Sequence, residues 1–171
     1  MNGQSVHIIF AHMHIDSVLI WGAVATIVLT TIMFLSQGLG FSRISLPFMI
    51  GTMFTANRDR ANIYGFIGHF VFGWLFSLLY AVIFESIGFA SVWLGLLIGA
   101  LHGLFVLSSM MPLLPFLHPR MATEHEGSNL TRMLEPPGFL GLNYGRRTPA
   151  EAFLAHLAYG AILNGFYKVV S

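Results

Sequence analysis

Three histidines stand within long apolar stretches of the sequence, and they are the residues best suited to chemistry. A neutral imidazole nitrogen binds transition-metal ions, and it also serves as an axial ligand of haem iron. If these stretches lie in lipid, each polar ring must face other helices and find a partner there. His69, His102 and His156 are therefore candidate metal ligands, and we expect a site that holds a metal ion, a haem or another small ligand.

Two of the histidines belong to a repeated pattern. Histidine, glycine and tyrosine stand at offsets of 0, 4 and 11, and the two copies are His69, Gly73, Tyr80 and His156, Gly160, Tyr167. An aromatic residue also stands at offset 3 in both copies. At about 100° per residue, offsets 4 and 11 lie close to the histidine on one helix face. Tyr80 and Tyr167 are therefore added to the candidate ligand-binding residues.

The likeness extends beyond these two stretches. Pro47 and Gly51 have the same spacing upstream of the first histidine as Pro137 and Gly141 have upstream of the last. Small residues also recur at matching intervals in the preceding apolar stretches, as Gly22, Thr26, Thr30 and Gly95, Gly99, Gly103. We interpret the chain as two homologous helical hairpins. Because each hairpin contains an even number of helices, the two are expected to be parallel and related by a twofold axis along the membrane normal.

The composition predicts a membrane protein. Of the 171 residues, 56% are hydrophobic and only 9% are charged, whereas a soluble domain carries about 25% charged residues. The chain has no cysteine, which excludes disulfides, thiolate metal sites and cysteine nucleophiles. Nothing in the charge pattern indicates nucleic acid as a partner, and the lipid bilayer is the expected environment.

Four apolar stretches are long enough to span a bilayer, at about residues 17–38, 62–85, 89–111 and 149–170. Residues 1–16 are expected to form a short interfacial segment, and residues 39–61 and 112–148 to form loops. Pro112 and Pro115 are expected to end the third helix. Thr148 is expected to cap the fourth helix, with Glu151 completing a capping box. The sequence thus predicts an all-α, integral membrane four-helix bundle that forms a single domain over residues 1–171.

The basic residues indicate the orientation. Seven of the eight stand in the two loops, as Arg43, Arg58, Arg60, Arg120, Arg132, Arg146 and Arg147, and only Lys168 stands on the other side. Because basic residues concentrate in cytoplasmic loops, both loops are expected in the cytoplasm and both termini outside.

Enzyme chemistry finds little support. No Asp or Glu lies in the interior of an expected span, which excludes a di-iron carboxylate centre there. Ser108 lies about 240° from His102 around a helix, so a serine nucleophile and its base would have to meet across helices. We expect a non-enzymatic protein. Two alternatives remain: an accessory or scaffold subunit of a larger membrane complex, for example in electron transfer, with purely structural histidines, or a small-solute transporter that acts as a homo-oligomer.

Several motifs together resemble a known family. They are Leu46-Pro47, Gly68-His69, Gly99-Ala-Leu-His102, Gly138-Phe-Leu-Gly141-Leu-Asn143 with Gly145, and His156-Leu-Ala-Tyr-Gly160. In this combination the chain resembles, over nearly its whole length, an uncharacterised family of small bacterial four-span inner-membrane proteins. The resemblance implies a location in a bacterial inner membrane and the four-span layout, and it implies no activity. Arg146 and Arg147 depart from it, because less charge is expected directly after the glycine loop.

Overall fold

The structure is a computed structural model that describes residues 13–123, 127–132 and 134–168. Its described residues form an all-α protein with six α-helices, which are α2 (Ile15–Gly38), α3 (Leu46–Thr52), α4 (Arg58–Ile87), α5 (Val92–Phe105), α6 (Met111–Leu117) and α7 (Thr148–Phe166). A π-helical turn (Val106–Met110) joins α5 to α6, and a 3-10 turn (Phe139–Tyr144) precedes α7. The expected interfacial segment 1–16 lies mostly outside the described residues, as do residues 169 and 170 of the last expected span.

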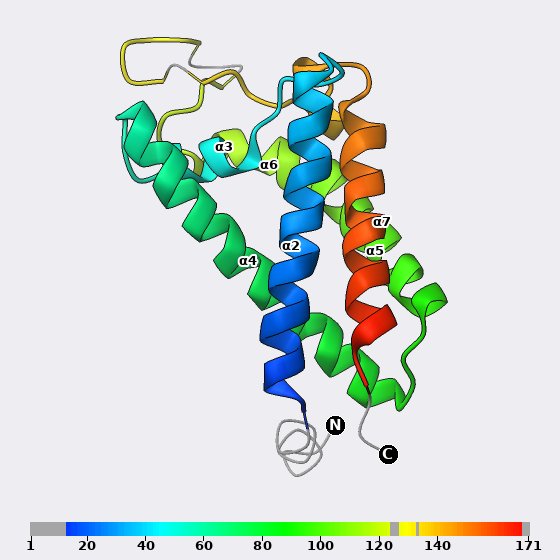
Figure 1. Ribbon diagram of the computed structural model, residues 1–171. Coiled ribbons are helices and arrows are strands. Elements are labelled where there is room, and N and C mark those ends of the chain that lie inside the picture. Colours follow the sequence, from blue (N-terminus) through cyan, green and yellow to red (C-terminus); the bar gives the residue numbers. More distant parts are fainter. Residues whose placement is uncertain (1–12, 124–126, 133, 169–171) are drawn as a thin grey trace.

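The long helices run back and forth along one direction (Figure 1). The helix α2 leads away from the end of the molecule at which α7 ends, and α4 returns to that end. Then α5 and α6 lead away again, and α7 returns beside α2 and α5. The short helix α3 and the described part of the loop after α6 lie at the opposite end, where α7 begins.

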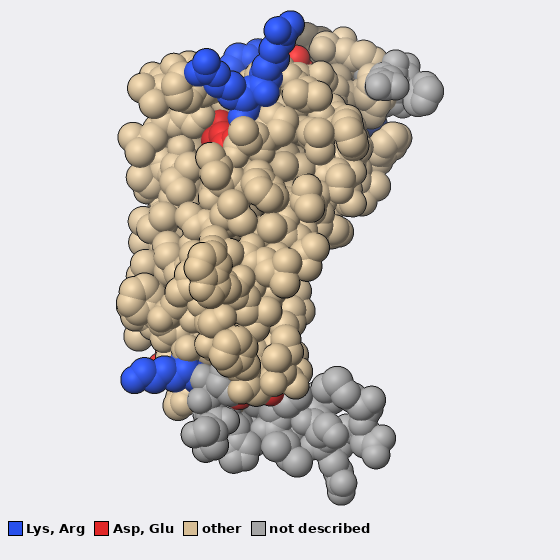
Figure 2. Space-filling view, turned by 90° about the vertical axis from the view of Figure 1, so that its right-hand side faces the viewer, with Lys and Arg blue, Asp and Glu red and all other residues tan. Residues whose placement is uncertain are grey.

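Three of these helices are long and apolar enough to cross a membrane. They cover Ile15–Gly38, Arg58–Ile87 and Val92–Leu117, the last one including the π-helical turn. Many large apolar side chains on their outer faces are exposed, among them Trp93 at 80% and Phe116 at 73%. Figure 2 shows charged side chains only near the two ends of the visible face, with a broad uncharged band between them. These features indicate a multi-pass membrane protein.

The third long helix does not end where the prolines predict. Pro112 lies in the first turn of α6, and Pro115 lies inside it. A proline removes one hydrogen bond of the helical ladder and crowds the carbonyl one turn earlier. The π-helical turn before Pro112 changes the ladder, since the amide of Met111 donates to the carbonyl of Val106. The altered register carries the helix on to Leu117.

The predicted capping box at α7 is wrong, although the helix does start at Thr148. The hydroxyl of Thr148 is 2.8 Å from the Ser42 hydroxyl, and the carboxylate of Glu151 accepts a hydrogen bond from Ser36. Both side chains therefore face the end of α2 and the segment that follows it, and neither caps α7.

In the first hairpin, small residues of α2 contact α4 closely. A Cβ atom added at Gly22 would lie 2.8 Å from the Cβ of Ser77, and one added at Gly73 would lie 2.0 Å from the hydroxyl oxygen of Thr26. Thr30, one turn after Thr26, and His69, one turn before Gly73, line the same cavity. The two backbones approach this closely because the contact residues are small.

The second hairpin repeats this row of contacts between α5 and α7. A Cβ atom added at Gly95 would lie 2.6 Å from the Cβ of Asn164, and one added at Gly160 would lie 3.0 Å from the Cα of Gly99. A Cβ atom at Gly103 would lie 3.1 Å from the Cβ of His156. Asn164 follows its histidine by the same interval as Ser77 follows His69, so equivalent sequence positions meet in both hairpins.

The helix α3 is fastened to the segment after α6. The ring of His118 donates from Nε2 to the Met49 carbonyl at 2.9 Å, and its Nδ1 accepts from the Arg120 amide at 3.1 Å. The guanidinium of Arg120 donates to the carbonyls of Thr52 at 2.8 Å and Met53 at 3.2 Å. Burial lowers the pKa of His118, so its ring is the neutral tautomer protonated at Nε2.

Candidate functional site

Two of the three candidate histidines lie in contact. His102 of α5 and His156 of α7 have ring centroids 4.6 Å apart, with ring planes at 79°. The glycine row of α5 makes the contact possible, because a Cβ atom at Gly99 would lie 2.5 Å from the carbonyl oxygen of His156. The side chain of His156 is buried, with 4% of the residue exposed. The structure therefore places an imidazole pair between two helices.

Hydrogen bonds occupy the Nδ1 atom of each ring. Nδ1 of His156 lies 2.7 Å from the Ala152 carbonyl oxygen, which can only accept, so this nitrogen carries the proton. Nδ1 of His102 lies 3.3 Å from the Tyr80 hydroxyl. Metal-binding histidines are typically held in this way, with the second ring nitrogen bonded to a carbonyl or another fixed group. The arrangement leaves Nε2 as the atom of His156 that can bind a ligand.

Aromatic rings surround the pair. Phe76 stacks on His102 with centroids 3.9 Å apart, and Tyr80 lies edge-on to Tyr159 at 5.7 Å. The hydroxyl of Tyr159 donates to the Gly73 carbonyl of α4, and the residue is 2% exposed. The sequence analysis did not select Tyr159 as a site residue, although the aromatic at offset 3 of the repeat was the available signal.

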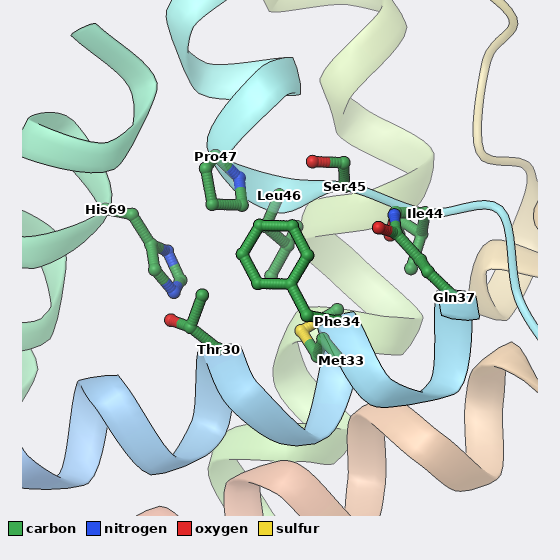
Figure 3. Close-up of a pocket in the computed structure, with 9 residues that line it drawn as sticks. All are labelled: Thr30, Met33, Phe34, Gln37, Ile44, Ser45, Leu46, Pro47 and His69. Atoms are coloured by element: carbon green, nitrogen blue, oxygen red, sulfur yellow. The ribbon is translucent and has the colours of Figure 1, made fainter. Parts of the chain in front are cut away.

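The third histidine lies elsewhere. His69 lines a cavity of about 10 Å³ between α4, α2 and the start of α3, and its ring points toward Thr30 and Pro47 (Figure 3). Its Nε2 atom is buried and has no hydrogen-bond partner. A cavity of this size has room for about one water molecule.

The expected three-histidine metal site is therefore not formed as a single cluster. In residues 13–123, 127–132 and 134–168, no group of three or more His, Cys, Asp and Glu side chains is placed to hold a metal ion. What the structure does bring together is the pair of His102 and His156, with Tyr80 beside it.

The remaining candidates lie outside the pair. Tyr167 follows the last residue of α7, and its hydroxyl donates to Glu85 at 2.7 Å. Tyr80 and Tyr167 thus occupy equivalent repeat positions but different surroundings, and only Tyr80 contacts a candidate histidine.

The glycine loop shapes the approach to α7. Gly138, Gly141 and Gly145 all have positive φ angles, of 71°, 73° and 140°. Asn143 fixes the turn, since its backbone amide donates to the Pro137 carbonyl and its side-chain amide to the carbonyl of the preceding proline. A Cβ atom at Gly141 would lie 3.1 Å from Thr148, the first residue of α7. The glycine loop is therefore a tight connection that packs against the start of α7.

The geometry of the pair distinguishes between possible metals. With metal–nitrogen bonds of about 2.0–2.1 Å, two imidazoles on one tetrahedral ion have ring centres about 5 Å apart. Two axial ligands of a haem iron need ring centres about 6 Å apart, with the porphyrin between them. The observed 4.6 Å between ring centres is nearer to the first spacing than to the second.

Comparisons with protein-family models, with curated proteins and with solved structures found no match to this chain.

Proposed function

We propose that this chain is a non-enzymatic integral membrane protein that holds a transition-metal ion at the pair of His102 and His156. The observation that carries the proposal is the contact of the two rings at 4.6 Å, with Nδ1 of each ring bonded to another group. In this arrangement Nε2 of each ring is the atom that would bind the ion.

We propose further that α7 is a fourth span and that the chain consists of two parallel hairpins. Support comes from the matched contacts of the small residues and from the path of α7, which runs beside α2 and α5. The resemblance to small bacterial proteins leads us to propose a bacterial inner membrane. The arginines of the two loops favour a cytoplasmic position for the loops, with the termini outside.

The donor set selects the class of metal. Neutral imidazoles suit Zn²⁺ and copper, whereas Mg²⁺ and Ca²⁺ prefer oxygen ligands. A structural zinc site has four protein ligands and a catalytic one usually has three. With two protein nitrogens we expect weaker, exchangeable binding, and water or a further ligand would complete the coordination. Tyr80 and Phe76 contact the ring of His102 and would orient it.

The experiment is a metal titration of the full chain purified in detergent. Zn²⁺ binding is measured by equilibrium dialysis with elemental analysis, and Co²⁺ is added as an optical probe of tetrahedral coordination. We expect about one ion per chain, and we expect the variant with both His102→Ala and His156→Ala to lose it. His69→Ala is the matched control, because it removes a buried histidine outside the pair and should keep the ion.

Two results would contradict the proposal. One is wild-type protein that binds neither ion. The other is binding that persists in the double variant. In either case the histidines are packing residues, and the role of an accessory subunit in a larger membrane complex becomes the better interpretation.

A further inference from the structure

A buried glutamate, Glu151, stands in the first turn of α7 and takes no part in the hydrogen bonds of the histidine pair. Glu151 is 7% exposed. Its Oε2 atom accepts a hydrogen bond from the Ser36 hydroxyl at 2.6 Å, whereas its Oε1 atom is buried and has no partner. A buried oxygen of a carboxylate without a partner is costly. A group that contacted Oε1 would remove this cost.

The surroundings of Glu151 are rich in hydroxyl oxygens. Ser36 belongs to the last turns of α2, Ser42 to the segment after α2, and Thr148 to the first turn of α7. The hydroxyls of Ser42 and Thr148 are 2.8 Å apart, and the backbone amide of Ile44 donates to the Ser42 hydroxyl at 3.2 Å. All three residues are buried, with 7%, 4% and 0% exposed for Ser36, Ser42 and Thr148.

The glycine loop closes this cluster from one side. A Cβ atom at Gly145 would lie 3.0 Å from the Phe41 carbonyl oxygen and 3.5 Å from the Cα of Ser42. The amide of Arg43 donates to the Tyr144 carbonyl at 2.8 Å, which holds the two segments together. The oxygen cluster is thus enclosed by three separate parts of the chain.

No basic side chain of the described residues forms an ion pair with Glu151. The nearby arginines have other partners: the guanidinium of Arg43 bonds Glu135 and the Asn143 carbonyl, and that of Arg147 lies over the Phe41 ring at 4.4 Å. Glu151 also lies in the first turn of α7, where the helix dipole favours the ionised carboxylate. An ionised Glu151 would therefore have no counter-ion among the described side chains.

We propose that Glu151, Ser36, Ser42 and Thr148 form a binding site for a small monovalent cation of the Na⁺ class. Carboxylate and hydroxyl oxygens are the ligands that hard cations take. A single carboxylate balances a single positive charge, which disfavours Ca²⁺. Such an ion would contact the unpartnered Oε1 and would join the end of α2 to the start of α7, so its binding stabilises the packing of these two helices.

The test is the thermal unfolding of the full chain in detergent, in equal concentrations of NaCl, LiCl, KCl and choline chloride. We expect NaCl to raise the unfolding temperature above that in choline chloride in a saturable way. Glu151→Gln should abolish the difference, and Ser42→Ala should shift its midpoint to a severalfold higher Na⁺ concentration. Glu135→Gln is the matched control, because it removes an exposed carboxylate and should leave the Na⁺ effect intact.

Three outcomes would overturn the inference. In the first, the unfolding temperature is the same in all four chlorides. In the second, the Na⁺ effect persists in Glu151→Gln. In the third, the unfolding temperature of the wild-type protein depends on pH but on no cation, which means that Oε1 is protonated instead. If Glu151→Gln does not fold, Ser42→Ala decides: an unchanged Na⁺ midpoint in that variant also overturns the inference.

Discussion

Gly73 of α4 and Thr26 of α2 lie in direct contact, because a Cβ atom at Gly73 would stand 2.0 Å from the Thr26 hydroxyl oxygen. That hydroxyl cannot turn away without cost, since it donates to the Gly22 carbonyl at 2.7 Å. The corresponding glycine of the second hairpin, Gly160, meets backbone instead: its added Cβ would lie 2.1 Å from the Gly95 carbonyl oxygen. Both hairpins therefore depend on the absence of a side chain at this position.

We predict that Gly73→Ala destabilises the protein by about 1–3 kcal/mol and that Gly160→Ala costs more, because a backbone cannot yield as a side chain can. The measurement is the free energy of unfolding in mixed micelles. Gly38→Ala is the control, since nothing lies within 4 Å of its added Cβ. Equal stabilities of all three variants would show that the two rows of contacts do not hold the hairpins.

The two matching rows of small-residue contacts could be predicted from the sequence because helix periodicity relates spacing directly to helix faces. The offsets of glycine and histidine select one face of each helix, and those faces do make the contacts between α2 and α4 and between α5 and α7. The surroundings of each copy could not be predicted in the same way. Phe72 is 48% exposed, whereas Tyr159 at the same offset is 2% exposed. Tyr159 is buried because it faces α4, where its hydroxyl donates to the Gly73 carbonyl and its ring contacts Tyr80.

Which residues meet in the candidate site depends on contacts between distant parts of the chain, and local sequence patterns do not predict such contacts. His102 has Leu29 at the equivalent position of the first hairpin, so the imidazole pair exists in one hairpin only. The hydrogen bond of Ser36 to Glu151 joins residues 115 positions apart. The capping rule predicted that Glu151 bonds the start of its own helix. In the structure its side chain bonds Ser36 of α2 instead.

The two buried repeat histidines should respond differently to replacement. His156→Leu removes the hydrogen bond to Ala152 and the contact with His102, so we expect a loss of about 1–3 kcal/mol. His69→Leu removes a ring whose Nε2 has no partner, so we expect a smaller loss. The comparison is made by unfolding both variants in the same micelles. A larger loss for His69→Leu would mean that a bound group satisfies its Nε2 atom.

Tyr80 should act on metal binding through His102. Tyr80→Phe removes the hydroxyl 3.3 Å from Nδ1 of His102 while keeping the ring. Loss of such a supporting contact typically lowers metal affinity about 10-fold or more, so we expect a shift of this size in the Zn²⁺ titration with unchanged stoichiometry. Tyr64→Phe, which alters an exposed tyrosine, should leave the titration unchanged. An unchanged affinity in Tyr80→Phe would show that this hydroxyl does not support the pair.

The attachment of α3 should depend on pH through His118. Burial is the main cause that lowers the pKa of this ring from its ordinary value of 6.5, and the charge of Arg120 acts in the same direction. The unfolded chain therefore binds a proton more readily than the folded protein. The neutral ring contributes stability that is fully present above about pH 6.5 and is lost as the pH falls toward the lower pKa of the folded state.

Protonation also converts Nδ1 of His118 into a donor that faces the Arg120 amide, which breaks that hydrogen bond. We expect wild-type protein to lose unfolding temperature between about pH 7.5 and pH 5, and His118→Gln to show a smaller loss over the same range. His14→Gln is the control, because His14 is exposed and lies directly before the first residue of α2. The readout for α3 itself is the hydrogen-exchange protection of its amides, corrected for the intrinsic pH dependence of exchange, which should fall at low pH in the wild-type protein. If the protection of the α3 amides is equal at both pH values, His118 does not control the attachment of this helix.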